Sequence, residues 1–243
     1  MAKRLTIPVR SLGSEVDTPS VTDLAAWAQA RAGQSGDLVT YHLMKTVEAQ
    51  KEVHTPAAGG WFYHERARAA SLPDAPADDI LDDIQAVSGI RKNCWWSLPP
   101  AAALFSDPDE DQILIFRQFL RMMRDAGVFG HVILLENDPT PLELELISGR
   151  RIFWHLMNPT ERALEKVLEV QRDIAVVPEL LPLLSDLMGS YTVRKIIVID
   201  GGEADLRAAM ELVDSDSIMT GGYAPAGEPS YWDELVEGSF IRR

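Results

Sequence analysis

The chain has 243 residues and a formal net charge of −14, and 46% of its residues are hydrophobic. This length and apolar content are sufficient for one large domain with a substantial core. The strong negative charge repels the phosphate backbone of nucleic acids, so we expect no nucleic-acid partner. The single cysteine, Cys94, excludes an internal disulfide bond and a metal site built from several cysteines.

The sequence also argues against a membrane location. Its N-terminal residues lack the apolar core of a signal peptide, and no run of about 18 uncharged apolar residues is present to span a bilayer. We therefore predict a cytoplasmic protein without a membrane partner. No motif identifies a cofactor, because the chain lacks a P-loop, a G-x-G-x-x-G fingerprint, a G-x-S-x-G elbow and an H-E-x-x-H sequence. The cofactor is therefore left unknown, and a homo-oligomer is compatible with the sequence.

In the first half of the chain, strands and helices are predicted to alternate. The runs typical of strands are residues 4–9, 37–44 and 90–98, and a loop is expected at residues 11–19. A first helix begins after Ser20, where Asp23 completes a variant of the capping box. Two further helices, with acidic residues at their starts and glycine at their ends, are predicted over residues 77–88 and 109–126.

Residues 54–76 form the least regular part of the sequence. They combine a Gly-Gly pair, the aromatic run Trp61-Phe62-Tyr63-His64 and a proline-rich stretch. Long irregular segments inside a compact domain are usually functional or mobile. We predict a single α/β domain over residues 1–243 that carries this segment as an insertion, which serves either as a lid or as an arm against a partner.

In the second half of the chain, predicted strands recur about every 21 residues, a spacing that is short for strand–helix–strand units but workable with helices of about three turns. These strands begin near Val132, Ile152, Ile174, Lys195 and Ser217. Two of the turns that follow them have similar sequences. In these turns the predicted helix N-caps are Asp138 and Asn158, and the predicted first helical residues are Pro139 and Pro159.

The clearest strand-to-helix junction is V-R-K-I-I-V-I-D-G-G-E at residues 193–203. Its continuous apolar run, from Ile196 to Ile199, is typical of a parallel strand covered on both faces. We therefore predict an α/β fold with a mostly parallel sheet flanked by helices. An open, Rossmann-like sheet of three layers is preferred, because the strands of the second half are closely spaced. A (β/α)8-type barrel is the alternative, because eight candidate strands can be counted.

Ligands of parallel sheets bind beyond the carboxyl ends of the strands, so the residues there form the candidate site. The residues predicted to carry acid–base chemistry are Asp200, Glu136 and His155. Two Gly-Gly turns follow successive strands, and the residues predicted to bind the ligand are Gly201, Gly202, Thr220, Gly221 and Gly222. These turns resemble the phosphate-binding edge of (β/α)8 barrels and, with the free N–H groups of a helix start, favour an anionic ligand.

Several of these residues also have a purely structural interpretation. Gly201 and Gly202 are equally suited to a simple tight turn, with Asp200 capping the next helix. His155 lies within an apolar run, as does a core histidine that is hydrogen-bonded to backbone. No metal site is predicted, because no known ligand spacing is matched by the three histidines His42, His54 and His64.

Two functions from different classes remain. In the first, the protein binds a small anionic molecule, which bears phosphate or carboxylate, at the carboxyl ends of the strands. If this protein is an enzyme, it uses acid–base chemistry. In the second, it is a non-catalytic accessory subunit that binds a protein partner through residues 54–76. The aromatic side chains distinguish the two, because a concave pocket at the strand ends favours the first and a flat exposed patch favours the second. We prefer the first.

Overall fold

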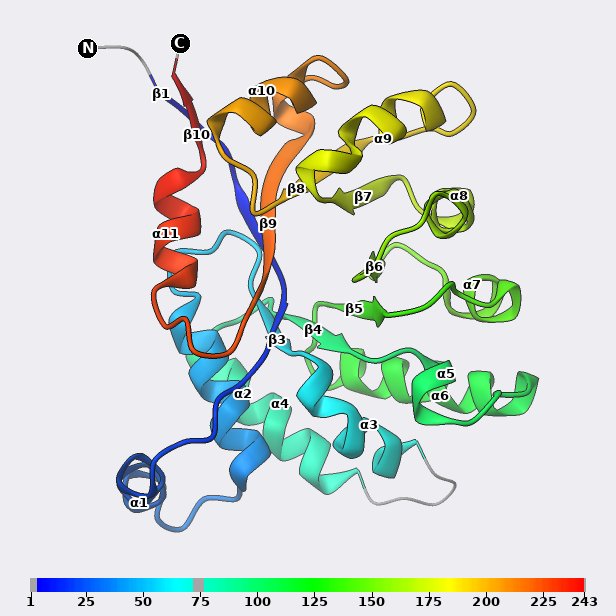
Figure 1. Ribbon diagram of the computed structural model, residues 1–243. Helices are drawn as coiled ribbons and strands as arrows, with labels where there is room; N and C mark the ends of the chain where they lie inside the picture. The colour runs from blue at the N-terminus through cyan, green and yellow to red at the C-terminus, as the bar shows by residue number, and fades with distance from the viewer. Residues whose placement is uncertain (1–3, 72–76, 243) are drawn as a thin grey trace.

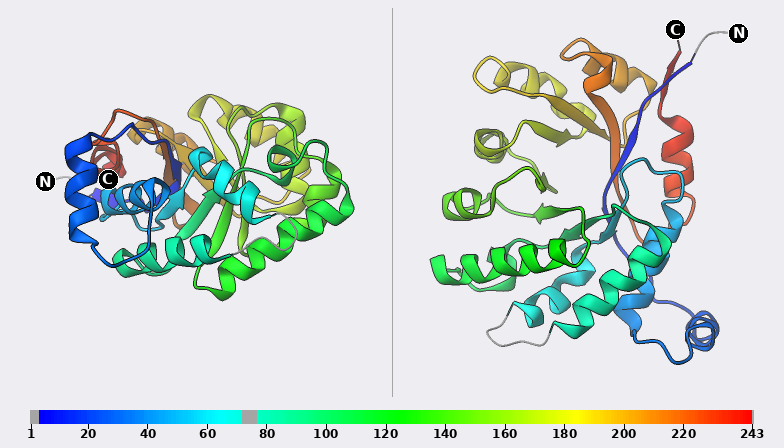
Figure 2. Two further views of the ribbon diagram at one scale, coloured as in Figure 1. Left: turned by 90° about the horizontal axis from the view of Figure 1, so that it is seen from below. Right: turned by 180° about the vertical axis from the view of Figure 1, so that it is seen from behind.

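The computed structural model describes residues 4–71 and 77–242, and within these ranges parallel strands form the centre of the molecule while helices cover its outside (Figure 1 and Figure 2). The central strands are β2 (Val9–Ser14), β3 (Ala57–Gly59), β4 (Trp95–Leu98), β5 (Gly130–Leu135), β6 (Ile152–Leu156), β7 (Asp173–Val176), β8 (Lys195–Ile199) and β9 (Ile218–Ala224). Two short strands, β1 (Arg4–Thr6) and β10 (Phe240–Arg242), pair antiparallel and bring the two ends of the described chain together.

Helices follow the strands around the outside. They are α1 (Val21–Ala30), α2 (Leu38–Ala49), α3 (His64–Ala70), α4 (Asp78–Ile90), α5 (Ala101–Leu104), α6 (Glu110–Asp125), α7 (Pro141–Ile147), α8 (Glu161–Val170), α9 (Leu181–Leu187), α10 (Glu203–Met210) and α11 (Tyr231–Gly238). Short 3-10 turns are η1 (Trp61–Tyr63), η2 (Pro178–Leu180) and η3 (Ser215–Ser217). In the described part of the chain, no helix has the length and apolar character needed to cross a membrane.

The eight central strands follow one another in chain order around a barrel. One parallel sheet has the order β3-β4-β5-β6, and the other has the order β2-β9-β8-β7. The two sheets adjoin at two seams, between β2 and β3 and between β6 and β7. At the first seam, the N–H of Ser11 donates to the carbonyl of Thr55 (2.9 Å), and the N–H of Thr55 donates to the carbonyl of Val9 (3.0 Å). This arrangement is that of a (β/α)8 barrel.

At both seams a glutamine amide takes the place of a neighbouring strand. The side chain of Gln50, next to the end of α2, accepts from the N–H of Ala57 (2.9 Å) and donates to the carbonyl of the same residue (2.8 Å). The side chain of Gln171, just before β7, makes the same pair of bonds with Trp154 of β6 (2.8 and 2.9 Å). An amide side chain offers a hydrogen-bond donor and an acceptor side by side. It can therefore pair with the backbone N–H and carbonyl groups of an edge strand, as a peptide group of a neighbouring strand would.

The interior of the barrel is filled by side chains. Alternate residues of the strands point inward, and they form one apolar cluster of Leu12, Ala57, Trp95, Val132, Leu134, Phe153, Ala175, Ile197 and Met219. Arg10 lies among them, with its guanidinium carbon 4.3 Å from the ring centre of Trp95 and 4.2 Å from that of Phe153. The opposite face of the strands packs under the helices in a larger apolar cluster. Ligand sites are therefore to be sought at the ends of the barrel.

The predicted α/β class, with parallel sheets flanked by helices, is confirmed. The preference for an open sheet of three layers is corrected in favour of the alternative, the barrel. The close spacing of the strands had argued against a barrel. It is accommodated by short helices, because α7 and α9 have 7 residues each and α10 has 8.

Three predictions in the first half of the chain need correction. Residues 37–44 begin helix α2 and are not a strand, because the side chains and N–H groups of Asp37 and Thr40 form a reciprocal capping box. The predicted loop at residues 11–19 begins inside strand β2. Residues 54–71 of the predicted irregular insertion contain β3, η1 and α3, so they form a regular strand–helix unit. The remaining part of that segment, residues 72–76, lies outside the described residues.

Most of the elements predicted for the second half of the chain are confirmed. Strands β5 to β9 are confirmed, and so is the long helix α6, which is capped by Asp109 and Gln112. The predicted helix caps are wrong by two residues. Thr140 and Thr160 are the N-caps of α7 and α8, and each hydroxyl accepts from the N–H three residues later. Threonine satisfies these N–H groups, so Asp138, Pro139, Asn158 and Pro159 precede the helices.

A buried charged cluster ties three of the outer helices together. The carboxylate of Asp83 in α4 is fully buried and accepts hydrogen bonds from the hydroxyls of Thr40 in α2 (2.7 Å) and Tyr63 (3.1 Å). Arg66 of α3 lies 3.4 Å from the same carboxylate and also binds Asp37 (2.6 Å) and Asp79 (2.8 Å). Burial raises the pKa of Asp83 from its ordinary value of 3.8 to about 6, although the hydrogen bond from Thr40 and the charge of Arg66 act in the opposite direction.

This raised pKa predicts a pH dependence of stability. As the pH rises, the unfolded chain loses the proton of Asp83 near the ordinary pKa, whereas the folded protein keeps it until about pH 6. The free energy of unfolding of the wild type should therefore fall by roughly 2–3 kcal/mol, relative to Asp83→Asn, between about pH 4 and pH 7. Urea unfolding of both proteins across this range measures the difference. A difference that stays constant with pH would contradict the prediction.

Candidate functional site

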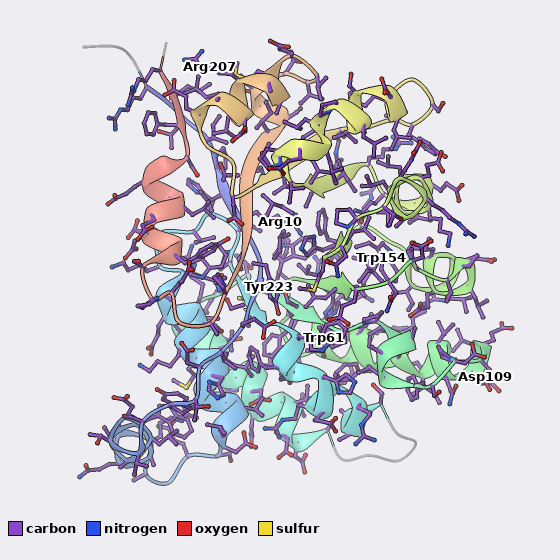
Figure 3. All side chains as sticks on the ribbon, viewed as in Figure 1. Arg10, Trp61, Asp109, Trp154, Arg207 and Tyr223 are labelled. Carbon is purple, nitrogen blue, oxygen red and sulfur yellow. The ribbon has the colours of Figure 1, made fainter. Side chains whose placement is uncertain are left out.

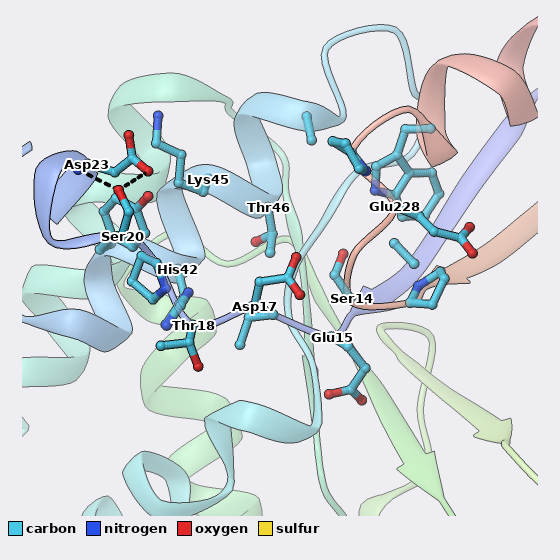
Figure 4. A pocket seen from close by; sticks show the side chains of 18 residues that line it. Ser14, Glu15, Asp17, Thr18, Ser20, Asp23, His42, Lys45, Thr46 and Glu228 are labelled. Carbon is cyan, nitrogen blue, oxygen red and sulfur yellow. Dashed lines mark hydrogen bonds between the residues drawn. The ribbon is translucent and has the colours of Figure 1, made fainter.

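Three cavities lie at the end of the barrel where the central strands terminate. The Asp200 cavity, about 620 Å³, is lined by residues after β8 and β9 and by α11. The Glu136 cavity, about 280 Å³, is lined by residues after β4 and β5 and by Trp61. The Ser14 groove, about 490 Å³, lies between the loop after β2, helix α2 and the loop after β9 (Figure 4). This is the end at which (β/α)8 barrels bind their ligands.

Asp200 directly follows β8. Its backbone has a φ of 50°, in the left-handed region that residues other than glycine rarely adopt, and its N–H donates to the carbonyl of Gly221 in β9 (2.9 Å). The hydroxyl of Tyr231, at the start of α11, donates to Oδ1 of Asp200 (2.5 Å). A side chain at Gly222 would overlap this hydroxyl, so the aspartate–tyrosine pair requires a glycine there.

The surroundings of Asp200 change its affinity for protons. Burial raises the pKa of the Asp200 carboxyl, and the hydrogen bond from Tyr231 acts in the opposite direction. Burial and the same hydrogen bond raise the pKa of Tyr231, so its hydroxyl stays protonated and remains the donor. Asp200 therefore holds a proton more readily than an exposed aspartate does. Carboxyl groups of this kind in a cavity are candidates for acid–base chemistry.

The two glycines after Asp200 line the same cavity and also shape the turn. A Cβ atom at Gly201 would overlap the side chain of Val198, so the turn after β8 needs a glycine. Gly202 is the N-cap of α10, and its N–H donates to Oδ2 of Asp205 (2.9 Å). The N–H group at the start of α10, which is predicted to bind an anionic ligand, is therefore already hydrogen-bonded to the Asp205 carboxylate.

The second Gly-Gly pair is not a turn, because Thr220, Gly221 and Gly222 lie within strand β9. Thr220 is fully buried and points away from the barrel interior, since its neighbour Met219 points inward. A Cβ atom at Gly221 would overlap the side chain of Ile197 inside the barrel. Gly221 therefore allows β9 to pack against Ile197, and Gly222 leaves room for the hydroxyl of Tyr231.

His155 lies inside the barrel below the carboxyl end. Its side chain is 4% exposed, lies on the inner face with Phe153, and has no hydrogen-bond partner for Nδ1 among the described residues. Burial and the positive charge of Arg10 lower the pKa of His155 to about 4, so the ring is neutral at pH 7. The position is that of a core histidine.

Glu136 follows β5 and is exposed in the wall of the Glu136 cavity. Asp200 lines a different cavity, and His155 lies in the interior. The structure therefore does not bring the three predicted acid–base residues together in one cavity.

A hydrogen-bonded junction, which sequence reasoning missed, connects the three cavities. The hydroxyl of Tyr223, near the end of β9, donates to Oε1 of Glu15 (2.6 Å) and accepts from the N–H of Trp61 (2.9 Å). Figure 3 labels Tyr223 and Trp61 near the centre of the molecule. Tyr223 lines the Asp200 cavity, Trp61 the Glu136 cavity and Glu15 the Ser14 groove. Burial and the bond to Glu15 raise the pKa of Tyr223, so the hydroxyl remains a donor.

The aromatic run of residues 61–63 is built into the barrel. Trp61 lines the Glu136 cavity at the strand ends, and Phe62 packs against the outer core. Tyr63 is fully buried. The three rings therefore do not form a flat exposed patch.

The histidines of the first half lie apart. The Nδ1 atom of His54 accepts from the N–H of Val9 (3.1 Å), Nε2 of His64 is 3.0 Å from the carbonyl of Ala103, and His42 lines the Ser14 groove. Among the residues that the structure describes, no group of three His, Cys, Asp or Glu side chains is arranged to hold a metal ion.

Comparisons with known proteins support the fold. No protein-family model matches the chain, and no curated protein matches it in sequence. Among solved structures it is similar to CpGH84B, with a TM-score of 0.55 and 10% identity over 96% of this chain and 48% of that chain. The chain thus spans about half the length of that protein.

Two further solved structures have lower scores. A dihydrodipicolinate synthase from Rhodopseudomonas palustris has a TM-score of 0.49 and 15% identity over 96% of this chain and 73% of that chain. A mutant O-GlcNAc hydrolase from Thermobaculum terrenum has a TM-score of 0.48 and 10% identity over 85% of this chain and 56% of that chain. The likeness to CpGH84B, at 10% identity, concerns the fold alone.

Proposed function

We propose that the protein binds a small polar molecule in the Asp200 cavity and uses the Asp200 carboxyl as a general acid–base. One residue carries this proposal. Asp200 ends a barrel strand, has a left-handed backbone, lines a cavity and has a raised pKa. Strained backbones and perturbed carboxyl groups both concentrate at functional sites, and this position in a barrel is where catalytic residues occur.

The charge of the cavity argues for a neutral or cationic ligand. Asp200, Glu228 and Glu234 all line it, and the described residues of its lining include no lysine or arginine. These carboxylates would repel the anionic ligand that the glycine turns suggested. The hydroxyls of Tyr223 and Tyr231, which belong to the same lining, suit a ligand rich in polar groups.

The alternative, a subunit that binds a partner protein through residues 54–76, has less support. An exposed aromatic surface was the feature that would favour it. In this segment Trp61 lines a concave cavity and Tyr63 is buried, so the aromatic side chains favour the small-molecule function.

A thermal-shift screen tests the proposal, with sugars, polyols, amines and phosphorylated metabolites as probes. We expect a neutral or cationic compound to stabilise the wild type, by about 2.7 kcal/mol at about 100 times its dissociation constant. Asp200→Asn keeps an acceptor for Tyr231, and asparagine tolerates the left-handed backbone, so this variant should fold but lose at least about tenfold in affinity.

The matched control is Asp186→Asn, which removes one exposed carboxylate from α9. This control should respond to the ligand as the wild type does. A screen without a stabilising compound, or a compound that stabilises Asp200→Asn and the wild type equally, would overturn the proposal.

A further inference from the structure

The Ser14 groove is a cavity that the proposed acid–base site does not use. Its lining shares Pro225 and Glu228 with the Asp200 cavity, and its other walls are different. Its volume of about 490 Å³ is typical of a site for a small molecule. The groove therefore has room for a ligand of its own.

Ser14, the last residue of β2, places an unsatisfied hydroxyl in the wall of this groove. Its side chain is 2% exposed, and within the described part of the chain its Oγ atom has no hydrogen-bond partner. A buried hydroxyl without a partner destabilises a folded protein, so native structures rarely contain one. Its presence in a cavity wall points to a ligand atom as its partner.

Two more oxygen acceptors share the groove with Ser14. Oδ2 of Asp17 accepts from the N–H of Gly227 (2.8 Å), which fixes the carboxylate and leaves its other oxygen available. The hydroxyl of Thr46 donates to the carbonyl of Leu43 (3.0 Å), so its lone pairs can accept from a ligand. Figure 4 shows the Asp17 carboxylate between Thr46 and Ser14 in that view.

The groove is negatively charged. Its lining contains four carboxylates, those of Glu15, Asp17, Asp23 and Glu228. The ammonium group of Lys45 in the same lining is bound by Glu48 (2.7 Å). Burial lowers the pKa of His42, with Asp17 acting in the opposite direction, so this histidine adds little positive charge at neutral pH. A cationic ligand would be attracted and an anionic one repelled.

We propose that the Ser14 groove binds a small molecule through a primary ammonium group, with the Asp17 carboxylate and the Ser14 and Thr46 hydroxyls as acceptors. An ammonium group has three N–H donors and no acceptor, which matches three oxygen acceptors in the lining of one groove. The buried rings of Tyr41 and Trp232 belong to the same lining and favour a cation further. This site does not depend on acid–base chemistry at Asp200.

The test is an NMR titration of ¹⁵N-labelled protein at neutral pH with benzylamine, an ammonium under these conditions, and with benzyl alcohol, its uncharged analogue. We expect saturable benzylamine shifts at the amides of residues 14–17 and of Thr46, and binding of benzyl alcohol weaker by about tenfold or more. Asp17→Asn keeps the acceptor for Gly227 but removes the charge, so it should weaken benzylamine binding by about tenfold or more. Ser14→Ala should weaken it about fivefold.

Stability separates a binding role from a structural one. Ser14→Ala deletes a hydroxyl that lacks a partner in the described protein, so its urea-unfolding midpoint should equal that of the wild type or exceed it. Asp186→Asn removes one exposed charge elsewhere, on α9, so it should bind benzylamine as the wild type does. Equal binding of benzylamine and benzyl alcohol, unchanged binding by Asp17→Asn, an absence of saturable shifts at the groove residues, or a destabilised Ser14→Ala protein would each overturn the proposal.

Discussion

Replacement of Gly60 by alanine is expected to destabilise the fold by about 3 kcal/mol or more. Gly60 follows β3 at the seam with β2. A Cβ atom at this position would overlap the carbonyl oxygen of Ser14 and lie 2.9 Å from the hydroxyl of Tyr223. Because the carbonyl belongs to the backbone of a barrel strand, no change of rotamer relieves the overlap, and the two strands would have to separate. The bonds that join Tyr223 to Trp61 and Glu15 would be disturbed as well.

Urea unfolding followed by tryptophan fluorescence measures this effect. The matched control is Gly89→Ala, because a Cβ atom at Gly89, near the end of α4, would meet no atom within 4 Å. Alanine is the better helix former, so this control should match the wild type or be more stable by up to about 1 kcal/mol. Similar unfolding midpoints for the two variants would refute the close contact of β2 and β3.

Replacement of Gln50 by leucine should cost about 3 kcal/mol of stability. The Gln50 side chain is fully buried, and its amide satisfies both the N–H and the carbonyl of Ala57, with a further bond to the carbonyl of Thr46 (3.0 Å). Leucine fills a similar volume but leaves these backbone groups without partners. Each unsatisfied buried group costs roughly 1–3 kcal/mol. The decrease in the free energy of unfolding therefore measures how much the Gln50 amide stabilises the seam between β2 and β3.

The control for this prediction is Gln29→Leu, which makes the same change at an exposed position of α1. Its free energy of unfolding should stay within about 0.5 kcal/mol of the wild-type value. If Gln50→Leu were as stable as Gln29→Leu, the amide would not act as a substitute for a strand.

The strands of the second half could be predicted because their apolar runs are long and uninterrupted. The first two barrel strands carry no such signal. β2 reads V-R-S-L-G-S, since its inner face includes Arg10, and β3 has only 3 residues. Residues 37–44 contain β-branched and aromatic residues that suggest a strand, but the Asp37–Thr40 capping box makes them helical. Because β2 and β3 cannot be recognised in the sequence, the eight strands cannot be placed in a closed ring from sequence alone. The sequence therefore favours an open sheet.

The candidate site could be predicted in part. Asp200 was identified because a strand end followed by two glycines is visible in a local window of sequence. Its partner Tyr231 lies 31 residues further on, and the partners Tyr223 and Glu15 are separated by 208 residues. The Tyr223–Glu15 pair forms because closure of the barrel brings β9 beside β2, and Tyr231 reaches Asp200 because β9 pairs with β8. Contacts of this kind depend on the register of distant strands, and no local pattern encodes that register.

We expect a small molecule to bind beside Asp200 at the carboxyl end of the barrel. A crystal structure of the protein, soaked with neutral and cationic fragments, tests this expectation. We expect electron density in the Asp200 cavity, with a polar fragment atom within hydrogen-bond distance of the Asp200 carboxyl or the Tyr231 hydroxyl. Fragments bound only at the amino end of the barrel or on the outer helices, with the Asp200 cavity empty, would contradict it.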